Sequence, residues 1–363
     1  MVNPQKVAIM DNFRDILLAD DKAKHETIPV VISSRIRLAR NLSGYRFVKY
    51  ACRDDLRKVA DKCEDTLKKY FLFKDKGAFS IKSLLDYEKC ALVEHHLCSQ
   101  ELIQDFNESR LVLRGDNMTS IMMNEEDHLR IQVFGSDLDF KAMFDEINVL
   151  DDYLCENLDI AFDEKYGFLT ACPTNVGTGM RASVMVHLPA LVMTKQITNI
   201  IHAVQKLGFV VRGTFGEGSE PYGNFFQISN QQTLGLSEVD ILSRLIQIIR
   251  SVVEYESNAR EILKKERQVW LYDNMGRALG VLRGCYSMGS IDAINCISLM
   301  IMASDMKYIP QSIKYDLNKI MMKSQSAHIQ VIEAKPLKQQ EIEIKRAEIL
   351  RKFFATVPDI KFE

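Results

Sequence analysis

Residues 128–133 read His128-Leu129-Arg130-Ile131-Gln132-Val133, and this stretch decides the fold class. Its apolar residues alternate with polar ones, which is typical of a strand with one buried face. Further short strands are expected over 184–188, 209–212 and 224–229. The stretches that carry apolar residues at helical spacing are 54–67 and 140–154. Together these elements predict an α+β core in which an antiparallel sheet is flanked by helices.

The character of the chain changes near Leu236. Ser237 followed by Asp240 resembles a capping box, and from there the sequence predicts helices almost throughout. A length of 363 residues suits two domains. We therefore expect an α+β domain over 1–255 and a small all-helical domain over 256–363.

Composition excludes several classes of protein. Lys and Arg total 47 against 49 for Asp and Glu, so no basic excess favours nucleic acid or an anionic membrane. No apolar run approaches the ~20 residues that span a bilayer. The N-terminus lacks the apolar core of a signal peptide, which predicts a cytoplasmic protein. Eight cysteines without a C-x-x-C pair predict buried thiols and no metal site.

Two arginines two residues apart stand out in Ser33-Ser34-Arg35-Ile36-Arg37. On a strand their side chains project from one face. They can form a phosphate clamp, because a guanidinium is always charged and binds phosphate oxygens in a bidentate manner. A solvated strand face explains the same pattern.

Three consecutive carboxylates occur in Met123-Asn124-Glu125-Glu126-Asp127-His128, between two apolar strands. Their mutual repulsion favours a site for a cationic group at a tight loop. An ordinary solvated loop is the alternative.

Two glycine-rich segments, 172–181 and 212–220, interrupt the predicted core. Gly177 and Gly179 allow a backbone to approach a ligand closely, and three glycines after Arg212 suit a lid. Plain turns explain both segments equally well. His96 is either structural or a partner for a nucleotide base.

Taken together, the segments converge on phosphoryl transfer from ATP to a cationic acceptor. Arginines and a metal neutralise phosphates, while carboxylates orient the nucleophile. The arginines at strand ends are Arg35, Arg37, Arg130, Arg181 and Arg212.

Four ordered motifs over residues 28–250 resemble the phosphagen (guanidino) kinases. They are S-S-R-I-R-L-A-R, N-E-E-D-H-L-R, C-P-T-N-V-G-T-G-M-R-A-S and R-G-T-F-G-E. The resemblance implies an α+β catalytic domain that phosphorylates a guanidinium nitrogen, using ATP with Mg²⁺ carried by the nucleotide.

The metabolic members of that family carry a helical domain before the arginine pair, whereas only 32 residues precede Ser33 here. A helical segment follows the core instead, which is similar to the bacterial protein-arginine kinase branch (McsB type). This likeness implies ATP-dependent phosphorylation of arginine side chains in proteins, in stress response and protein quality control. A kinase for free arginine or another small guanidine, and an inactive adaptor for arginine-rich or phosphoarginine proteins, are the alternatives.

The resemblance also implies site residues. Glu126 and Glu217 are the expected catalytic carboxylates, and Cys172 is expected beside the acceptor nitrogen, with a pKa lowered by guanidinium groups. The expected nucleotide-binding residues are Ser33, Ser34, Arg35, Ile36, Arg37, His96, Arg130, Arg181, Ala182, Ser183, Val184, Met185, Arg212, Gly213, Thr214, Phe215, Gly216 and Glu217.

Expected partners are arginine-containing protein substrates, a small zinc-binding activator protein and an AAA+ protease system. A homodimer through 256–363 is also expected, because Ile297 and 299–302 exceed the apolar surface that so small a domain hides.

The tail departs from the protein-arginine kinase pattern. Where that branch has the phosphoarginine-binding motif R-D-x-x-R-A, this chain has Ile342-Glu343-Ile344-Lys345-Arg346-Ala347. Loss of the first guanidinium predicts weak or absent activation by free phosphoarginine.

Overall fold

A computed structural model describes residues 28–73, 78–104, 108–114, 118–213 and 222–362. The chain divides into two compact units. Among the described residues, the first unit comprises Ser33–Ser183 and Asn230–Leu245. The second unit comprises the described residues of Thr27–Ile32, Val184–Ser229 and Ile246–Glu363.

The strands are ordered β2-β3-β4-β5-β1-β8-β10-β9 in an eight-stranded sheet, with a separate β6-β7 pair. Neighbours from β2 to β1 in this order are antiparallel. The strand bounds are β1 Val31–Arg40, β2 Phe79–Ser80, β3 Arg110–Leu113, β4 Thr119–Met123, β5 Leu129–Gly135, β6 Phe162–Asp163, β7 Gly167–Phe168, β8 Met180–His187, β9 Phe209–Gly213 and β10 Phe225–Asn230.

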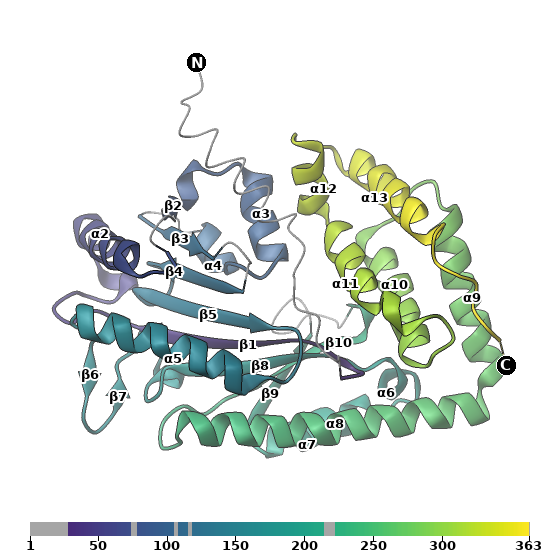
Figure 1. The fold of residues 1–363 in the computed structure, drawn as a ribbon, viewed down its shortest axis with the longest axis horizontal. Coiled ribbons are helices and arrows are strands. Elements are labelled where there is room, and N and C mark those ends of the chain that lie inside the picture. Colours follow the sequence, from purple (N-terminus) through teal and green to yellow (C-terminus); the bar gives the residue numbers. More distant parts are fainter. Residues whose placement is uncertain (1–27, 74–77, 105–107, 115–117, 214–221, 363) are drawn as a thin grey trace. The chain divides into compact units, whose positions relative to one another are not determined.

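Helices flank the sheet and form almost all of the chain after β10 (Figure 1). Their bounds are α2 Arg53–Lys69, α3 Asp86–Glu94, α4 Gln100–Gln104, α5 Phe140–Asn157, α6 Pro189–Met193, α7 Ile197–Lys206, α8 Glu238–Glu266, α9 Gln268–Gly284, α10 Ser290–Asp305, α11 Lys314–Lys323, α12 Ser326–Glu333 and α13 Gln339–Phe354. The 3₁₀ turns are η1 Val48–Tyr50, η2 Ile81–Ser83, η3 Pro173–Asn175, η4 Tyr222–Asn224 and η5 Gln311–Ile313. None of the helices in the described ranges is both long and apolar enough to cross a bilayer.

The predicted α+β class is confirmed, and each predicted helix and strand is present. The helices predicted over 54–67 and 140–154 are α2 and α5, and β8 begins at Met180, four residues before the predicted strand. The predicted cap at Ser237 also forms, because its hydroxyl accepts the Asp240 N–H at 3.1 Å. Helix α8 runs without interruption across 255/256, and the domain boundary placed there stays a prediction.

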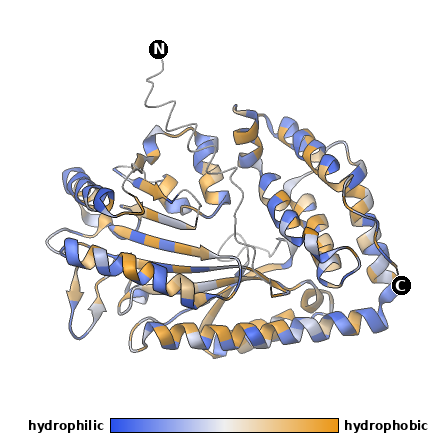
Figure 2. Ribbon diagram, in the orientation of Figure 1, coloured by the Kyte–Doolittle hydropathy of each residue, from blue (hydrophilic) through white to orange (hydrophobic). Residues whose placement is uncertain are grey.

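The register of β1 against β5 gives the sheet two chemically different faces. Ile36 lies opposite Val133 and Leu38 opposite Ile131, and all four are buried. Helix α5 packs on β5, and its apolar residues Phe140, Met143, Ile147, Leu150 and Leu154 are buried. Figure 2 shows that α5 carries both apolar and polar residues. The alternate β1 positions, including Arg35 and Arg37, therefore face the other way.

Arg40 joins β1 to α5 by a buried ion pair. Its Nε and Nη2 donate to Asp151 Oδ1 and Oδ2 at 2.9 and 2.6 Å, and Nη1 donates to Thr178 O at 3.0 Å. The guanidinium also lies 3.4 Å from the centre of the Phe168 ring. One side chain thus ties together the strand, the helix and the segment that leads to β8.

The expected excess of apolar surface in α10 is wrong. Ile297 and 300–302 are fully buried within the single chain, and Leu299 is half-buried. Helices α9 and α11 pack against α10, as does η4, which lies about 70 residues earlier in the sequence. Apart from part of Leu299, these residues therefore provide no exposed surface for a second copy, and the homodimer stays a prediction without this support.

Removing the Asp151 carboxylate should leave the Arg40 guanidinium buried without its counter-ion. We expect Asp151→Ala to lower the free energy of unfolding by about 3–5 kcal/mol, measured by urea denaturation. The exposed neighbour Asp152 on the same helix offers the matched control, Asp152→Ala, which should change stability little. Equal effects of the two substitutions would contradict the assignment.

Candidate active site

Four arginines of the first unit form a cluster on one face of the sheet. Arg35 and Arg37 come from β1, Arg130 from β5 and Arg181 from β8. Burial lowers the pKa of Arg35 to about 9, well below the usual value of a guanidinium, with Arg130 and Arg181 adding to the effect. Burial also lowers the pKa of Arg37, together with the charges of the other three arginines. These residues are hereafter the arginine cluster.

Like charges gather in the cluster, because Arg35 and Arg37 are each repelled by Arg130 and Arg181. A pKa of about 9 leaves Arg35 charged at neutral pH, so the repulsion persists in the folded protein. The buried Nε of Arg37 has no hydrogen-bond partner within the described part of the chain. Buried donors normally find acceptors, so this arrangement fits a multiply charged anion such as a polyphosphate.

Glu125 is the carboxylate that offsets part of this charge. Its side chain is 2% exposed, forms an ion pair with Arg130 Nη1 and accepts the Glu126 N–H at 2.8 Å. Burial alone would raise the pKa of Glu125, but Arg130, the Ser99 hydroxyl, the Glu126 amide and Arg37 together lower it. Sequence reasoning gave Glu125 no role, because adjacent residues of a loop carry no period that shows which one points inward.

Unlike Glu125, Glu126 is exposed to solvent. Partial burial of its carboxylate raises its pKa, and the nearby Asp127 and Glu125 raise it further. A carboxylate with a raised pKa is a better proton acceptor. Glu126 is thus available to a ligand, whereas Glu125 is paired with Arg130 within the protein.

Cys172 lies at the start of η3, with its Sγ 3.0 Å from Thr174 Oγ1. Gly177 and Gly179 pack closely against neighbouring backbone, which leaves no room for a side chain at either position. A Cβ on Gly177 would meet the Thr233 carbonyl, and one on Gly179 would lie 2.7 Å from the Ala39 carbonyl. Both have positive φ values, so the segment turns sharply and packs directly on neighbouring backbone.

His96 follows α3 with a φ of +60°. Its carbonyl accepts Gln132 Nε2 at 3.0 Å, and Gln132 lies opposite Arg37 in the sheet. Directly opposed residues of an antiparallel pair share a face. The His96 backbone is therefore anchored on the face that carries the arginine cluster.

Other predicted residues lie elsewhere. Ser34 and Ile36 are buried on the opposite face, where the Ser34 hydroxyl donates to Asp137 O, and Ser33 is half-buried on the arginine face. The Ala182 N–H donates to Asn230 Oδ1 at 2.8 Å, and Ser183 is buried.

The remaining predicted residues fall in the second unit or beyond the described ranges. Val184, Met185, Arg212 and Gly213 belong to the second unit, on β8 and β9. Residues 214–217, which include Glu217, lie outside the described residues.

Arg346 of the altered tail motif is completely buried. Its Nε and Nη1 donate to the carbonyls of Ser324 and Met288 at 2.7 and 2.8 Å, and its Nη2 donates to Ser326 Oγ at 2.8 Å. Every nitrogen of this guanidinium is therefore used to hold neighbouring backbone and side chain.

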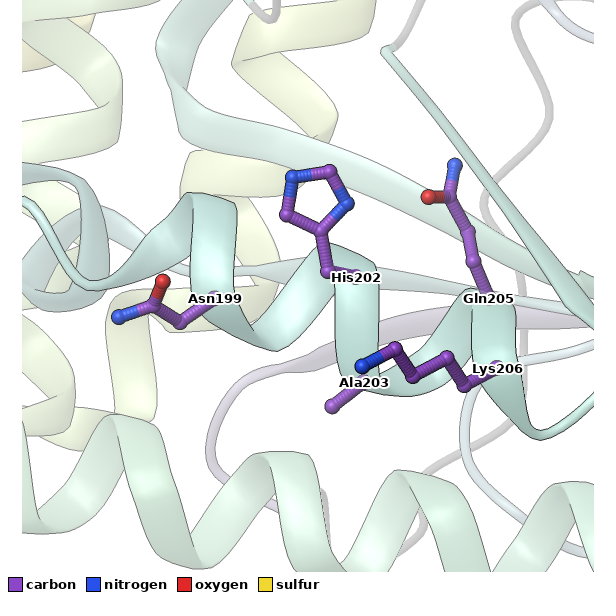
Figure 3. Close-up of a pocket in the computed structure, with 5 residues that line it drawn as sticks. All are labelled: Asn199, His202, Ala203, Gln205 and Lys206. Carbon is purple, nitrogen blue, oxygen red and sulfur yellow. The ribbon is translucent and has the colours of Figure 1, made fainter.

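A surface hollow of about 670 Å³ lies on α7 (Figure 3). None of its lining residues is a predicted site residue. They are Asn199, His202, Ala203, Gln205 and Lys206.

Comparisons with known proteins identify the family of the chain. The model of the ATP:guanido phosphotransferase C-terminal catalytic domain matches residues 58–259, and that of the protein-arginine kinase McsB C-terminal domain matches 268–363. A protein-arginine kinase of Clostridium acetobutylicum is 41% identical over 89% of this chain and 95% of its own. One from Geobacillus sp. (strain WCH70) is 42% identical over 89% and 90%.

Solved structures share the fold at lower identity. A lombricine kinase has a TM-score of 0.57 at 23% identity, covering 67% of this chain and 70% of its own. The duplicated taurocyamine kinase of Schistosoma mansoni has a TM-score of 0.59 at 22% identity, covering 82% of this chain and 42% of its own. The chain therefore belongs to the ATP:guanido phosphotransferase family and, within it, to the protein-arginine kinases.

Proposed function

We propose that the chain transfers the γ-phosphoryl group of ATP to the guanidinium of arginine residues in proteins. One observation carries this proposal: the arginine cluster gathers guanidinium groups that repel one another, and Glu126 is exposed in the same loop as Glu125, the carboxylate that pairs with Arg130. The cations suit the triphosphate, and the free carboxylate suits a cationic acceptor. The relatives named protein-arginine kinases support the same acceptor.

Arg35, Arg37, Arg130 and Arg181 neutralise the phosphates of ATP in this proposal. Stabilisation by positioned charges accounts for most of phosphoryl-transfer catalysis. Mg²⁺ is carried by the nucleotide and offsets further phosphate charge when bound. From the family resemblance, the nucleotide also contacts Ser33, Ser34, Ile36, His96, residues 182–185 and residues 212–217. Because Ser34 and Ile36 point to the opposite face, their contribution is limited to backbone groups.

Glu126 acts on the acceptor. The pKa of a guanidinium lies far above neutral, so the acceptor is not deprotonated beforehand at neutral pH. Glu126 holds it in line and takes one N–H proton as the N–P bond forms, while the β–γ P–O bond breaks and ADP leaves. Cys172 holds the acceptor beside that nitrogen, and Glu217 is the proposed second carboxylate.

The domain assignment and the partners are part of the proposal. We assign a catalytic domain to 1–255 and a helical domain to 256–363, and the matches of the two family models to 58–259 and 268–363 support a division in this part of the chain. From the family resemblance we add a cytoplasmic location, a homodimer, a small zinc-binding activator, an AAA+ protease system and a role in stress response.

The acceptor is tested by incubating the protein with ATP and an arginine-rich protein, followed by mass spectrometry at neutral pH for acid-labile phosphoarginine. Free L-arginine at the same guanidine concentration is assayed in parallel by ADP release. We expect protein-bound arginine to react faster. Faster turnover of free arginine would favour a metabolic guanidino kinase, and no turnover of either would favour an adaptor.

Glu126→Gln should abolish transfer and leave ATP binding nearly unchanged, because it removes the base and keeps the size. A positioned base contributes roughly 10²–10⁴-fold to the rate, so the loss is easily measured by ADP release. Glu101→Gln, at an exposed neighbouring carboxylate on α4, is the matched control and should retain activity. Retention of more than about a tenth of the wild-type rate by Glu126→Gln would exclude this role.

Free phosphoarginine should activate this protein weakly or not at all. Ile342 replaces the first arginine of the motif and is buried, and the Arg346 guanidinium is fully bonded to protein atoms. The measurement is a titration of kinase activity with phosphoarginine, with free arginine as the control. Strong activation at micromolar phosphoarginine would show that Arg346 releases its present partners.

A further inference from the structure

A buried polar network joins the loop that carries Glu126 to the segment that carries Cys172. Asp127 is 2% exposed, and its Oδ1 accepts the Asn41 Nδ2 at 2.6 Å and the Ala171 N–H at 2.7 Å. Asn41 Nδ2 also donates to Leu169 O at 3.0 Å. Asp127 directly follows Glu126, and Ala171 directly precedes Cys172, so one carboxylate oxygen connects the two segments.

The other end of the network is a histidine held in one neutral form. Asn41 Oδ1 accepts the His128 N–H at 3.0 Å, and His128 Nδ1 accepts the Leu42 N–H at 3.0 Å. The proton is therefore on Nε2, which donates to Arg46 O at 2.9 Å. Burial lowers the pKa of His128 and keeps the ring neutral. The network thus has defined donors and acceptors throughout.

The segment beyond Cys172 is held separately. The Thr233 hydroxyl lies 2.8 Å from Thr174 O and 2.7 Å from Val176 O, and the Thr178 N–H donates to Thr233 O at 3.2 Å. With Ala171 fixed by Asp127, the backbone is anchored on both sides of the Cys172 thiol. The position of Glu126 relative to Cys172 depends on Asp127, the next residue in the chain.

We propose that Asp127 is a positioning residue for phosphoryl transfer, which sets the spacing between Glu126 and Cys172 through its bonds to Ala171 and Asn41. This inference rests on the proposed acceptor roles of Glu126 and Cys172. The Asp127 carboxylate is buried and receives neutral N–H donors, so its function requires an acceptor oxygen and not a negative charge exposed to substrate. Asp127 therefore has a different role from Glu125, which pairs with an arginine, and from Glu126, which faces the acceptor.

Two substitutions of Asp127 distinguish the need for its acceptor oxygen from the need for its negative charge. Asp127→Asn retains an oxygen that can accept both N–H groups, whereas Asp127→Ala removes it. Because a misplacement of about 1 Å costs on the order of 100-fold in rate, we expect Asp127→Ala to lower kcat/KM for the protein acceptor about 100-fold. The KM for ATP should stay within about twofold, and Asp127→Asn should stay within about threefold of wild type in both constants.

Alkylation of Cys172 gives a readout that needs no kinase activity. The rate of reaction with iodoacetamide, followed by peptide mass spectrometry, should change in Asp127→Ala and remain that of wild type in Asp127→Asn. The exposed Cys90 and Cys155 provide internal references whose rates stay constant. Asp54→Ala, which removes an exposed carboxylate from α2, is the control for both assays.

The outcomes are distinct. An Asp127→Asn variant as impaired as Asp127→Ala would show that the charge is required and would overturn the inference, as would an unchanged Cys172 rate in Asp127→Ala. If thermal unfolding shows that Asp127→Ala does not fold, Asn41→Ala replaces it, and an unaffected acceptor kcat/KM there overturns the inference equally. If the wild type phosphorylates no arginine, the proposed function fails, while the alkylation rates still test the positioning of Cys172.

Discussion

Arg35, Arg37, Arg130 and Arg181 repel one another across one face of the sheet, and the strands hold them together against that repulsion. The opposite face makes this possible, because Ile36, Leu38, Ile131 and Val133 are buried beneath α5 and fix the register of β1 against β5. A one-residue slip would turn the arginines of β1 towards α5 and move the apolar residues of β1 to the arginine face. Charge that is gathered before a ligand arrives needs little rearrangement when phosphates bind, which is the general basis of electrostatic preorganisation.

The loop between β4 and β5 assigns three adjacent acids to three environments. Asn124 turns the chain with a φ of +56°, and its side chain donates to Leu56 O at 2.8 Å and Glu108 O at 3.0 Å. Glu125 then points into the arginine cluster, Glu126 faces solvent and Asp127 is buried against Ala171 and Asn41. Separating the carboxylates in this way relieves their mutual repulsion and leaves one of them available to an acceptor.

The helical region is stabilised by buried charges that compensate one another. Glu256 accepts Arg260 Nε at 2.8 Å, and Asp305 pairs with Arg260 at 3.0 Å and with Lys314 at 2.7 Å. Glu256 also accepts the N–H groups of Ala190 and Leu191 at the start of α6. Such a network is costly to break by removing one partner, and it joins α6, α8, α10 and α11 within the second unit. Arg346 adds a further buried guanidinium that is satisfied by carbonyls.

Local periodicity was sufficient to predict the helices α2 and α5, the strands β5, β8, β9 and β10, and the shared face of Arg35 and Arg37. The arginines with acidic and glycine-rich loops indicated phosphoryl transfer onto a cationic acceptor, and the resemblance to the phosphagen kinases implied that this acceptor is a guanidinium. The pairing of Arg130 with Glu125, the burial of α10 and the packing of Gly177 and Gly179 were not predictable in this way. Arg130 and Glu125 are only five residues apart, but a loop has no period that shows which of its acids points inward. The other two features depend on residues far apart in the sequence, since a period of 2 or 3.6 residues shows which face is apolar but not what covers it. By itself the sequence determined the elements and the chemical groups that they carry, whereas the tertiary structure decided which charges meet, because only packing brings distant strands, loops and helices within reach of one another.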